Sequence, residues 1–197
     1  MPEVNALESR LLSVPNLDSE EDKEVYLNAV FRGEVDFPLS NGGMGIDFSG
    51  APLAAEMMDN NAIGKVSLSA HGYELLRPGL DINGKQLHEY SAPERRALLE
   101  EWNRIAIEEI ITEVREKSEH GVLGANCMHI LHHFDPTLET IIKSKEIDIG
   151  EFGAGMPSVG MLQRLNEEDA QHMRYVPIVS SVFAAQVIMR YALRNNG

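Results

Sequence analysis

The sequence predicts an α/β fold built on a parallel sheet, and three observations support this. Short apolar runs alternate with helical segments five times between residues 36 and 194, which is the pattern of successive βαβ units. Each run ends in small or polar residues, and the carboxyl ends of parallel strands carry the binding site. The 197 residues are 43% hydrophobic, enough for one domain with a substantial core. Five such ends favour a (β/α) barrel over an open, doubly wound sheet.

The expected strands are short and end in sequences that suit a binding loop. They are Phe37–Leu39, Ala62–Leu68, Val122–Met128, Ile147–Phe152 and Tyr175–Val179, and their ends read SNGGMG, SLSAHG, NCMH, FGAGMPS and VSS. A dinucleotide-binding sheet would carry G-x-G-x-x-G after its first strand and an acidic residue after its second. The stretch GGMGIDFSG fits that spacing poorly, and the second run ends in serines. We therefore expect a ring of loops around one ligand.

Helices are expected between these strands, with recognisable ends. Pro52–Asp59 is a short one, and the longest follows Ser91, which forms an S-x-x-E capping box with Glu94. Gly121 is expected to cap that helix at its carboxyl end. Asp135 is expected to be the N-cap of the next helix, and SVFAAQVIMRYALR forms the last. An apolar stripe at helical spacing is expected to bury the long helix, through Leu98, Trp102, Ile105, Ile110 and Val114.

The acidic composition excludes several classes of partner. The net charge of −14 argues against nucleic acid and against an anionic membrane surface, and no apolar run is long enough to span a bilayer. Residues 1–33 read as an N-terminal extension before a domain at 34–197. They lack the basic start and apolar centre of a signal peptide. With a single cysteine, Cys127, a cytoplasmic location is expected.

Five strand-end segments, in order, resemble one family. They are NGGMG at Asn41–Gly45, AIGKVSLSAHGY at Ala62–Tyr73, LGANCM at Leu123–Met128, GAGMPS at Gly153–Ser158 and YVPIVSSVFAA at Tyr175–Ala185. The chain thus resembles the flavin-dependent nitronate monooxygenases, once grouped as 2-nitropropane dioxygenases. These are FMN-binding TIM barrels related to an FMN-dependent enoyl reductase. The resemblance implies an oxidoreductase that uses oxygen to oxidise a small-molecule substrate, a nitroalkane or a nitronate.

The resemblance also implies which residues hold the FMN. The peptides of the first loop would lie against the isoalloxazine ring, and Asn126 would hydrogen-bond the flavin, because a side-chain amide offers both a donor and an acceptor. The remaining candidates come from the second, fourth and fifth strand ends, and Arg174 is a further one. The complete cofactor-binding set is Gly42, Gly43, Met44, Ser67, Asn126, Gly153, Ala154, Gly155 and Ser180.

The chain departs from the family in its polar residues and its extent. Lys65 stands where the family has an apolar residue, and Glu151 stands at or inside the barrel. An ion pair between these two is favoured over a functional carboxylate, because residues of one layer meet in a barrel interior. The resemblance covers five of eight strands. It includes neither the family's Gly-Gly-His segment, whose histidine is the proposed base, nor its phosphate-binding loops. The catalytic residue is therefore unknown.

Alternatives to these roles stay open. His129 is a candidate replacement for the missing proton acceptor, although most loop histidines are structural or solvated. His129, His132 and His133 have spacing that suits zinc, but exposed loop histidines are favoured and no metal is expected. Cys127 is expected to point between sheet and helices as a small hydrophobe.

A five-stranded part of a barrel has two open edges, which recruit other chains. We therefore expect a homo-oligomer or a complementary C-terminal chain. The competing interpretations are a truncated product, a fragment completed by another polypeptide, and a compact non-catalytic remnant or assembly partner. Within enzymes, the alternative is an enoyl reductase of the same superfamily. Whether the chain acts alone as an enzyme stays open.

Overall fold

The computed structural model describes residues 35, 39–43, 49–68, 81–82, 85–131 and 134–195, with backbone only for 81–82 and 191–195. The expected N-terminal extension, residues 1–33, lies outside this range. So does Met44, and so do His132 and His133. Within the described part, the chain is a mixed α/β structure whose parallel sheet has four strands.

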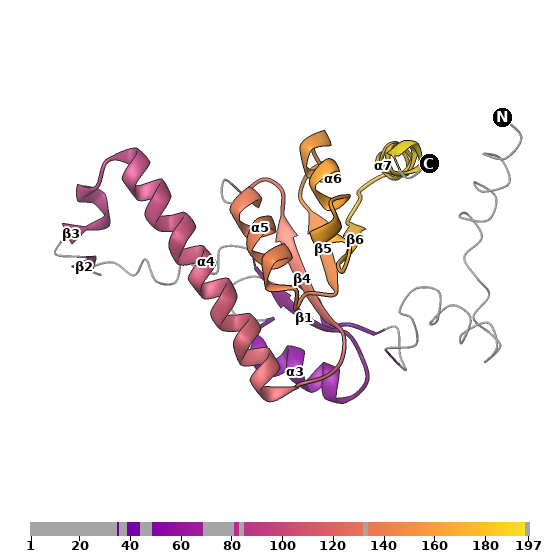
Figure 1. Ribbon diagram of the computed structural model, residues 1–197, viewed down its shortest axis with the longest axis horizontal. Helices are drawn as coiled ribbons and strands as arrows, with labels where there is room; N and C mark the ends of the chain where they lie inside the picture. The colour runs from indigo at the N-terminus through magenta and orange to yellow at the C-terminus, as the bar shows by residue number, and fades with distance from the viewer. Residues whose placement is uncertain are drawn as a thin grey trace, which may run out of the picture.

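The four strands of the sheet follow one another in space as they do in sequence (Figure 1). They are β1 (Gly64–Ser67), β4 (Leu123–Met128), β5 (Ile149–Gly153) and β6 (Arg174–Pro177), paired in the order β1-β4-β5-β6 and all parallel. A parallel bridge between Ser40 and Ile63 places the end of the first expected strand beside β1. The parallel sheet is therefore confirmed. Residues 36–38 of the expected first strand lie outside the described residues.

The remaining elements connect these strands. They are α3 (Ala51–Asp59), β2 (Asp81–Ile82), β3 (Lys85–Gln86), the 3₁₀ turn η2 (Leu87–Glu89), α4 (Ala92–Lys117), α5 (Phe134–Ser144), α6 (Val159–Leu165), the 3₁₀ turn η3 (Glu168–Ala170) and α7 (Val182–Asn195). The antiparallel pair β2–β3 was not predicted. No described helix is long and apolar enough to cross a membrane.

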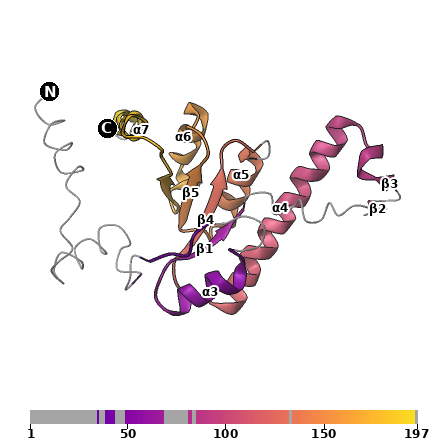
Figure 2. The same cartoon turned by 180° about the vertical axis from the view of Figure 1, so that it is seen from behind.

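The main core lies between the sheet and helices α3 to α6, which form a second layer on one face (Figures 1 and 2). Alternate residues of the strands enter it, because successive side chains of a strand point to opposite faces. The strand residues Val66, Ala125, Cys127 and Phe152 are buried there together with Ile107, Ile110, Val114, Leu138 and Ile141 from the helices. Cys127 is 2% exposed, as expected of a small core hydrophobe.

The opposite face of the sheet is more polar. It carries Lys65, whose register partner is Gly124, and also Ser67, Asn126 and Glu151, which are in register across β1, β4 and β5. Near the amino ends of the strands a small apolar cluster of Val35, Ile63, Val122 and Ile149 closes this face. The polar residues therefore lie toward the carboxyl ends, where the sequence predicts the site.

The two predicted ends of the long helix differ in outcome. The capping box is confirmed, since the backbone N–H of Ser91 donates to Glu94 at 2.8 Å. Gly121 is not the cap of α4: the helix ends at Lys117 and Ser118 is its C-cap. The Ser118 hydroxyl also donates to Asp59 at 2.6 Å, which ties the helix end to α3.

The predicted stripe of α4 is correct only in the second half of the helix. Of the five predicted residues, only Ile110 and Val114 are buried, and the buried set also contains Asn103, Ala106, Ile107 and Ile111. The first half of α4 extends beyond the sheet (Figure 1). Asp135 is not an N-cap either, because α5 begins one residue earlier, at Phe134, and Asp135 lies in its first turn.

Candidate functional site

The candidate site is the carboxyl edge of the sheet, where the first loop meets β1 and β4. Gly43 lies directly against the side chain of Asn126, so close that a Cβ atom on Gly43 would overlap Asn126 Cβ and would lie 2.5 Å from Asn126 Cγ. Ser67 is the register partner of Asn126, which in turn pairs with Glu151. The structure thus brings the paired glycines, the serine and the asparagine together.

The first loop is held in place by side chains around it. Asn41 uses its amide like a strand backbone: it accepts from the Lys65 N–H and donates to the Lys65 carbonyl, each at 2.7 Å. The hydroxyl of Ser49, which is 1% exposed, donates to the Gly42 carbonyl. These hydrogen bonds hold the Gly42 peptide in a fixed position. A Cβ on Gly42 would meet nothing within 4 Å, so its surroundings are open.

Two polar side chains, Ser67 and Asn126, lie at this edge of the sheet. The Ser67 hydroxyl is buried, with the residue 4% exposed, and it forms no hydrogen bond within the described part of the chain. Asn126 is half-buried. Buried polar groups in native structures normally find partners. The Ser67 hydroxyl therefore has capacity for a hydrogen bond beyond those made within the described part of the chain.

The predicted ion pair between Lys65 and Glu151 is confirmed. Lys65 Nζ lies 2.6 Å from Glu151 Oε1, and the side chains are 7% and 20% exposed. The ammonium also donates to the Ser40 hydroxyl at 2.9 Å. Because the two charges neutralise each other, the floor of the site carries no net charge from this pair.

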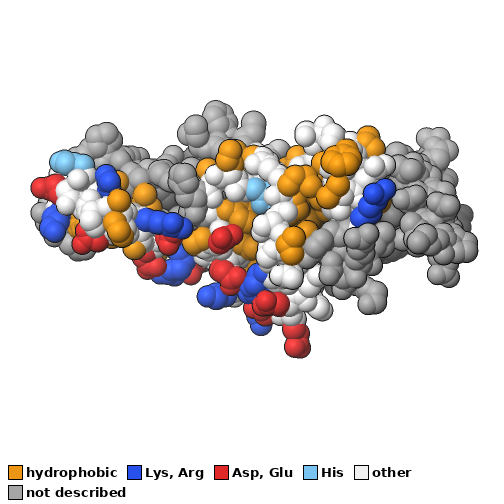
Figure 3. Space-filling model, turned by 90° about the horizontal axis from the view of Figure 1, so that it is seen from above, with side chains coloured by type: hydrophobic (Ala, Val, Ile, Leu, Met, Phe, Trp, Pro, Cys, Tyr) orange, Lys and Arg blue, Asp and Glu red, His pale blue; other side chains and the backbone are white. Residues whose placement is uncertain are grey.

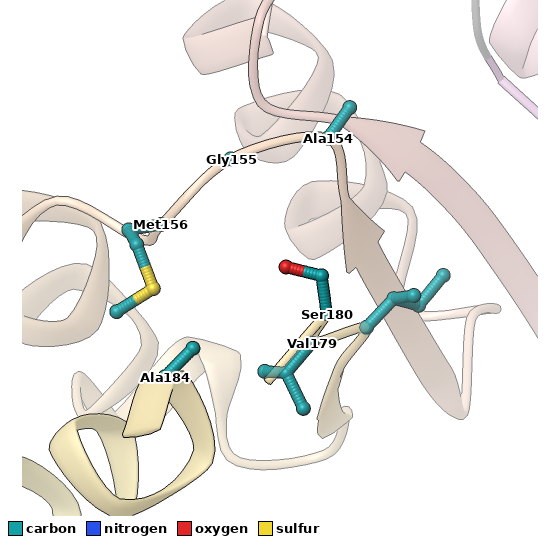
Figure 4. Close-up of a pocket in the computed structure, with 7 residues that line it drawn as sticks. Ala154, Gly155, Met156, Val179, Ser180 and Ala184 are labelled. Carbon is teal, nitrogen blue, oxygen red and sulfur yellow. The ribbon is translucent and has the colours of Figure 1, made fainter. Parts of the chain in front are cut away.

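A second group of predicted residues forms a separate part of the edge, around a cavity of about 360 Å³ (Figure 4). Ala154, Gly155 and Ser180 line it, with Met156, Ile178, Val179 and Ala184. The Ser180 hydroxyl points into the space below the Ala154–Met156 loop. Gly153 is close to Ile178, a lining residue: a Cβ added to Gly153 would lie 3.3 Å from Ile178 Cδ1.

The backbone of this loop has an unusual conformation. Ala154 has φ 54° and Gly155 has φ 153°. A left-handed alanine costs about 1 kcal/mol, and a Cβ on Gly155 would lie 3.1 Å from His129 Cβ. The turn after β5 is therefore shaped by local crowding against the loop that follows β4.

The carboxyl edge also carries exposed apolar side chains, which Figure 3 shows from above. They extend from the end of β4 across α6 to the first turns of α7. The exposed residues in this region are Met128, Ile130, Met156, Val159, Val176, Ile178, Val179, Val182, Phe183 and Val187.

His129 lies on the helix side of the edge. Its ring centroid is 4.5 Å from that of Phe134 in α5 and 5.9 Å from that of Phe152. Burial lowers the pKa of His129, and its Nε2 has no hydrogen-bond partner among the described residues. Its ring thus packs with core aromatics, whereas Asn126 faces the opposite side of the sheet. The role of His129 as a proton acceptor stays a prediction.

Arg174 does not lie at the carboxyl edge. Arg174 is the first residue of β6, and its backbone N–H donates to the Asp148 carbonyl at 2.8 Å, so it lies at the amino end of the sheet.

Within the described part of the chain, no three His, Cys, Asp or Glu side chains form a metal cluster. Burial raises the pKa of the Cys127 thiol to about 12, which leaves it protonated at neutral pH.

Sequence reasoning gave no role to Asn41, Ser49 or Gly124. Asn41 and Ser49 anchor the loop, and Gly124 lies under the Lys65 stem. Asn and Ser beside glycines commonly hydrogen-bond nearby backbone, which is a signal for the first two. Nothing in the sequence alone shows which side chain passes over Gly124.

Comparisons with known proteins bear on the fold. No family model matches the chain, and no curated protein matches it in sequence. FabK from Thermotoga maritima has a similar structure, with a TM-score of 0.56, 19% identity, and 84% of this chain covered against 40% of its own. Nitroalkane oxidase from Streptomyces ansochromogenes is similar with a TM-score of 0.57 and 10% identity. The match covers 82% of this chain and 45% of that structure's chain. The chain spans less than half the length of these structures, and the likeness shows a shared fold.

Proposed function

We propose that the chain is the flavin-ring-binding part of an FMN-dependent oxidoreductase resembling nitronate monooxygenase, which oxidises nitroalkanes or nitronates with oxygen. The observation that carries the proposal is the convergence of Gly42, Gly43, Ser67 and Asn126 on one edge of a parallel sheet. The structural likeness to a nitroalkane oxidase and to FabK supports it. We further propose that β1, β4, β5 and β6 are part of a (β/α)₈ barrel, because their spatial order follows the sequence.

The residues present fit an isoalloxazine ring. The open surroundings of Gly42 let a flat ring approach the peptide without a Cβ in the way. The unpartnered Ser67 hydroxyl and the Asn126 amide can meet the polar edge of the ring, which carries both donors and acceptors. Bound flavin would supply the capacity to accept two electrons from the substrate.

The chain's own residues would bind and orient. Asn41 and Ser49 hold the glycine loop at a fixed position. Asn126 would orient the ring through hydrogen bonds to its polar edge. The Lys65–Glu151 ion pair crosses from β1 to β5 beneath these groups. Such pre-positioning lowers the entropic cost of reaching a reactive geometry.

The first experiment is a fluorescence titration of FMN with the purified chain. We expect saturable quenching, and Asn126→Ala should weaken FMN binding by about tenfold through the loss of up to two hydrogen bonds. Asn60→Ala is the matched control, since Asn60 is an exposed amide that bonds only within the α3 end. Equal affinities for the wild type and Asn126→Ala would contradict the assigned role of the amide.

A second titration separates recognition of the ring from recognition of the phosphate. The resemblance covers no phosphate-binding segment, so riboflavin and FMN should bind this chain with similar affinity. A much tighter affinity for FMN than for riboflavin would show a phosphate contact that the proposal lacks.

Turnover distinguishes the two candidate reactions. The second is favoured by the relation of the resembled family to an FMN-dependent enoyl reductase and by the structural likeness to FabK. Oxygen consumption with a nitronate supports the first reaction, and NAD(P)H oxidation with an enoyl thioester supports the second. A chain that binds no flavin at any concentration would instead support the non-catalytic interpretation.

A further inference from the structure

Lys65 connects three segments that are distant in sequence. Its ammonium contacts Glu151 on β5 and Ser40 in the first loop, and its backbone bonds to Asn41. We propose that Lys65 is a positioning residue that fixes the Ser40–Gly43 loop against β5 and so sets the place of the flavin ring. The link to flavin rests on the proposed function, whereas the link to the loop rests on the contacts alone.

The Lys65 side chain passes over Gly124. β4 lies between β1 and β5, so the side chain must pass over β4 to reach Glu151. Gly124 is the register partner of Lys65, and a Cβ there would lie 3.4 Å from Lys65 Cγ. The Lys65 stem thus lies close to the Gly124 backbone, and its ammonium comes within 2.6 Å of the carboxylate.

The other end of the link lies in the glycine loop. Lys65 Nζ donates to Ser40 Oγ at 2.9 Å, while the Asn41 amide exchanges two hydrogen bonds with the Lys65 backbone. The two residues that follow are Gly42 and Gly43, whose peptides form the candidate ring contact. Any tilt of the loop would move these peptides relative to Asn126, which Gly43 touches.

The charges indicate a role beyond filling space. Burying an ion pair costs desolvation free energy, and apolar residues of similar volume often stabilise as well or better. Here the pair joins non-adjacent strands, and Glu151 is in register with Asn126 and Ser67, the two polar groups at the edge. The pair thus fixes the relative position of the groups that would surround the ring.

The test measures the loop before any flavin is added. Hydrogen exchange of the peptides that contain Gly42 and Gly43 is compared in the wild type, Lys65→Met and Glu151→Gln. Lys65→Met should raise the exchange rate of this loop by about tenfold, because one charge-assisted hydrogen bond is lost. The exchange rate of β4 should stay unchanged. Glu151→Gln should change it less, because the amide oxygen still accepts from the ammonium. Lys143→Met, on the exposed face of α5, is the charge-matched control.

A double variant covers the case in which Lys65→Met fails to fold. Lys65→Met/Glu151→Leu leaves neither charge unpaired, so it should fold while its loop still exchanges about ten times faster than the wild type. Loop exchange that stays at the wild-type rate in a folded Lys65→Met or double variant overturns the proposal.

The flavin measurement then separates this proposal from the proposed function. If the wild type binds FMN, the double variant should bind it about tenfold more weakly, and unchanged affinity overturns the positioning role. If the wild type binds no FMN, the proposed function fails, and the exchange result alone supports or overturns the anchoring of the loop by Lys65.

Discussion

Gly43→Ala perturbs the contact on which the candidate site depends. The new Cβ would overlap Asn126 Cβ and lie 2.5 Å from Asn126 Cγ and 3.0 Å from Oδ1. Ordinary van der Waals contact begins near 3.4 Å, so the loop or the amide must move by about 1 Å. Over-packing of this kind lowers the free energy of unfolding by about 1–3 kcal/mol. A 1 Å displacement of a binding group also costs up to about 100-fold in function.

Two adjacent glycines give this prediction a matched control. Gly42→Ala introduces the same methyl group into a place with no neighbour within 4 Å, so its free energy of unfolding should stay within about 0.5 kcal/mol of the wild type. If a ring lies over this peptide, Gly42→Ala should still weaken FMN binding.

The assay combines urea unfolding with FMN titration of the same samples. Gly43→Ala should lose both stability and affinity, whereas Gly42→Ala should lose affinity alone. Equal stability of Gly43→Ala and the wild type would refute the close packing of the loop on Asn126. Wild-type affinity in both variants would refute the contact between these peptides and the flavin.

Three further predictions concern the core beside the site. Phe152→Ala should lower the free energy of unfolding by about 3–5 kcal/mol in urea, because Phe152 is 1% exposed; a loss below about 1 kcal/mol would contradict its packing. Cys127 should not react with a thiol reagent in the native state, because burial raises its pKa to about 12, and should react fully in urea; rapid native reaction would show an accessible thiol. Burial lowers the pKa of His129, so the unfolded state binds the proton more readily. Stability should therefore fall as pH drops below about 6.5, and His129→Phe should flatten that dependence.

The strands were predictable because their pattern is local. A buried parallel strand reads as a short apolar run, and its end carries small or polar residues. The pairing of Lys65 with Glu151 was also predicted, because both residues were expected inside the barrel in one layer. The structure places them on the same face but one layer apart, since Lys65 is in register with Gly124 and Ile149. A charge on that face needs a partner nearby, and the two residues are the matching charges.

The helix ends were less predictable because they depend on distant contacts. Ser118 ends α4 while its hydroxyl bonds to Asp59, which lies 59 residues earlier. Gly121, with φ 100°, instead forms the turn into β4 where α3 passes closely, since a Cβ there would lie 3.0 Å from Met58 Cβ. A local pattern shows that glycine is needed, but not whether a helix or a neighbouring element needs it.

The position of the site groups also depended on tertiary structure. His129 follows a strand end that faces the candidate site, yet its ring packs against Phe134 and Phe152. Successive side chains of a strand point to opposite faces of the sheet. A shift of one position therefore moves a side chain to the other face. The contact between Gly43 and Asn126 joins residues 83 positions apart, and only the family resemblance indicated it.

The central claim is that the carboxyl ends of neighbouring strands form one surface that binds the flavin ring. An NMR titration of the labelled chain with FMN tests it most directly. The account predicts saturable shifts, with one shared dissociation constant, at the amides of Gly42 and Gly43 and at the side-chain amide of Asn126, while exposed α4 residues such as Glu108 stay unchanged. Shifts that are absent, that saturate at different FMN concentrations, or that occur away from this edge would contradict it.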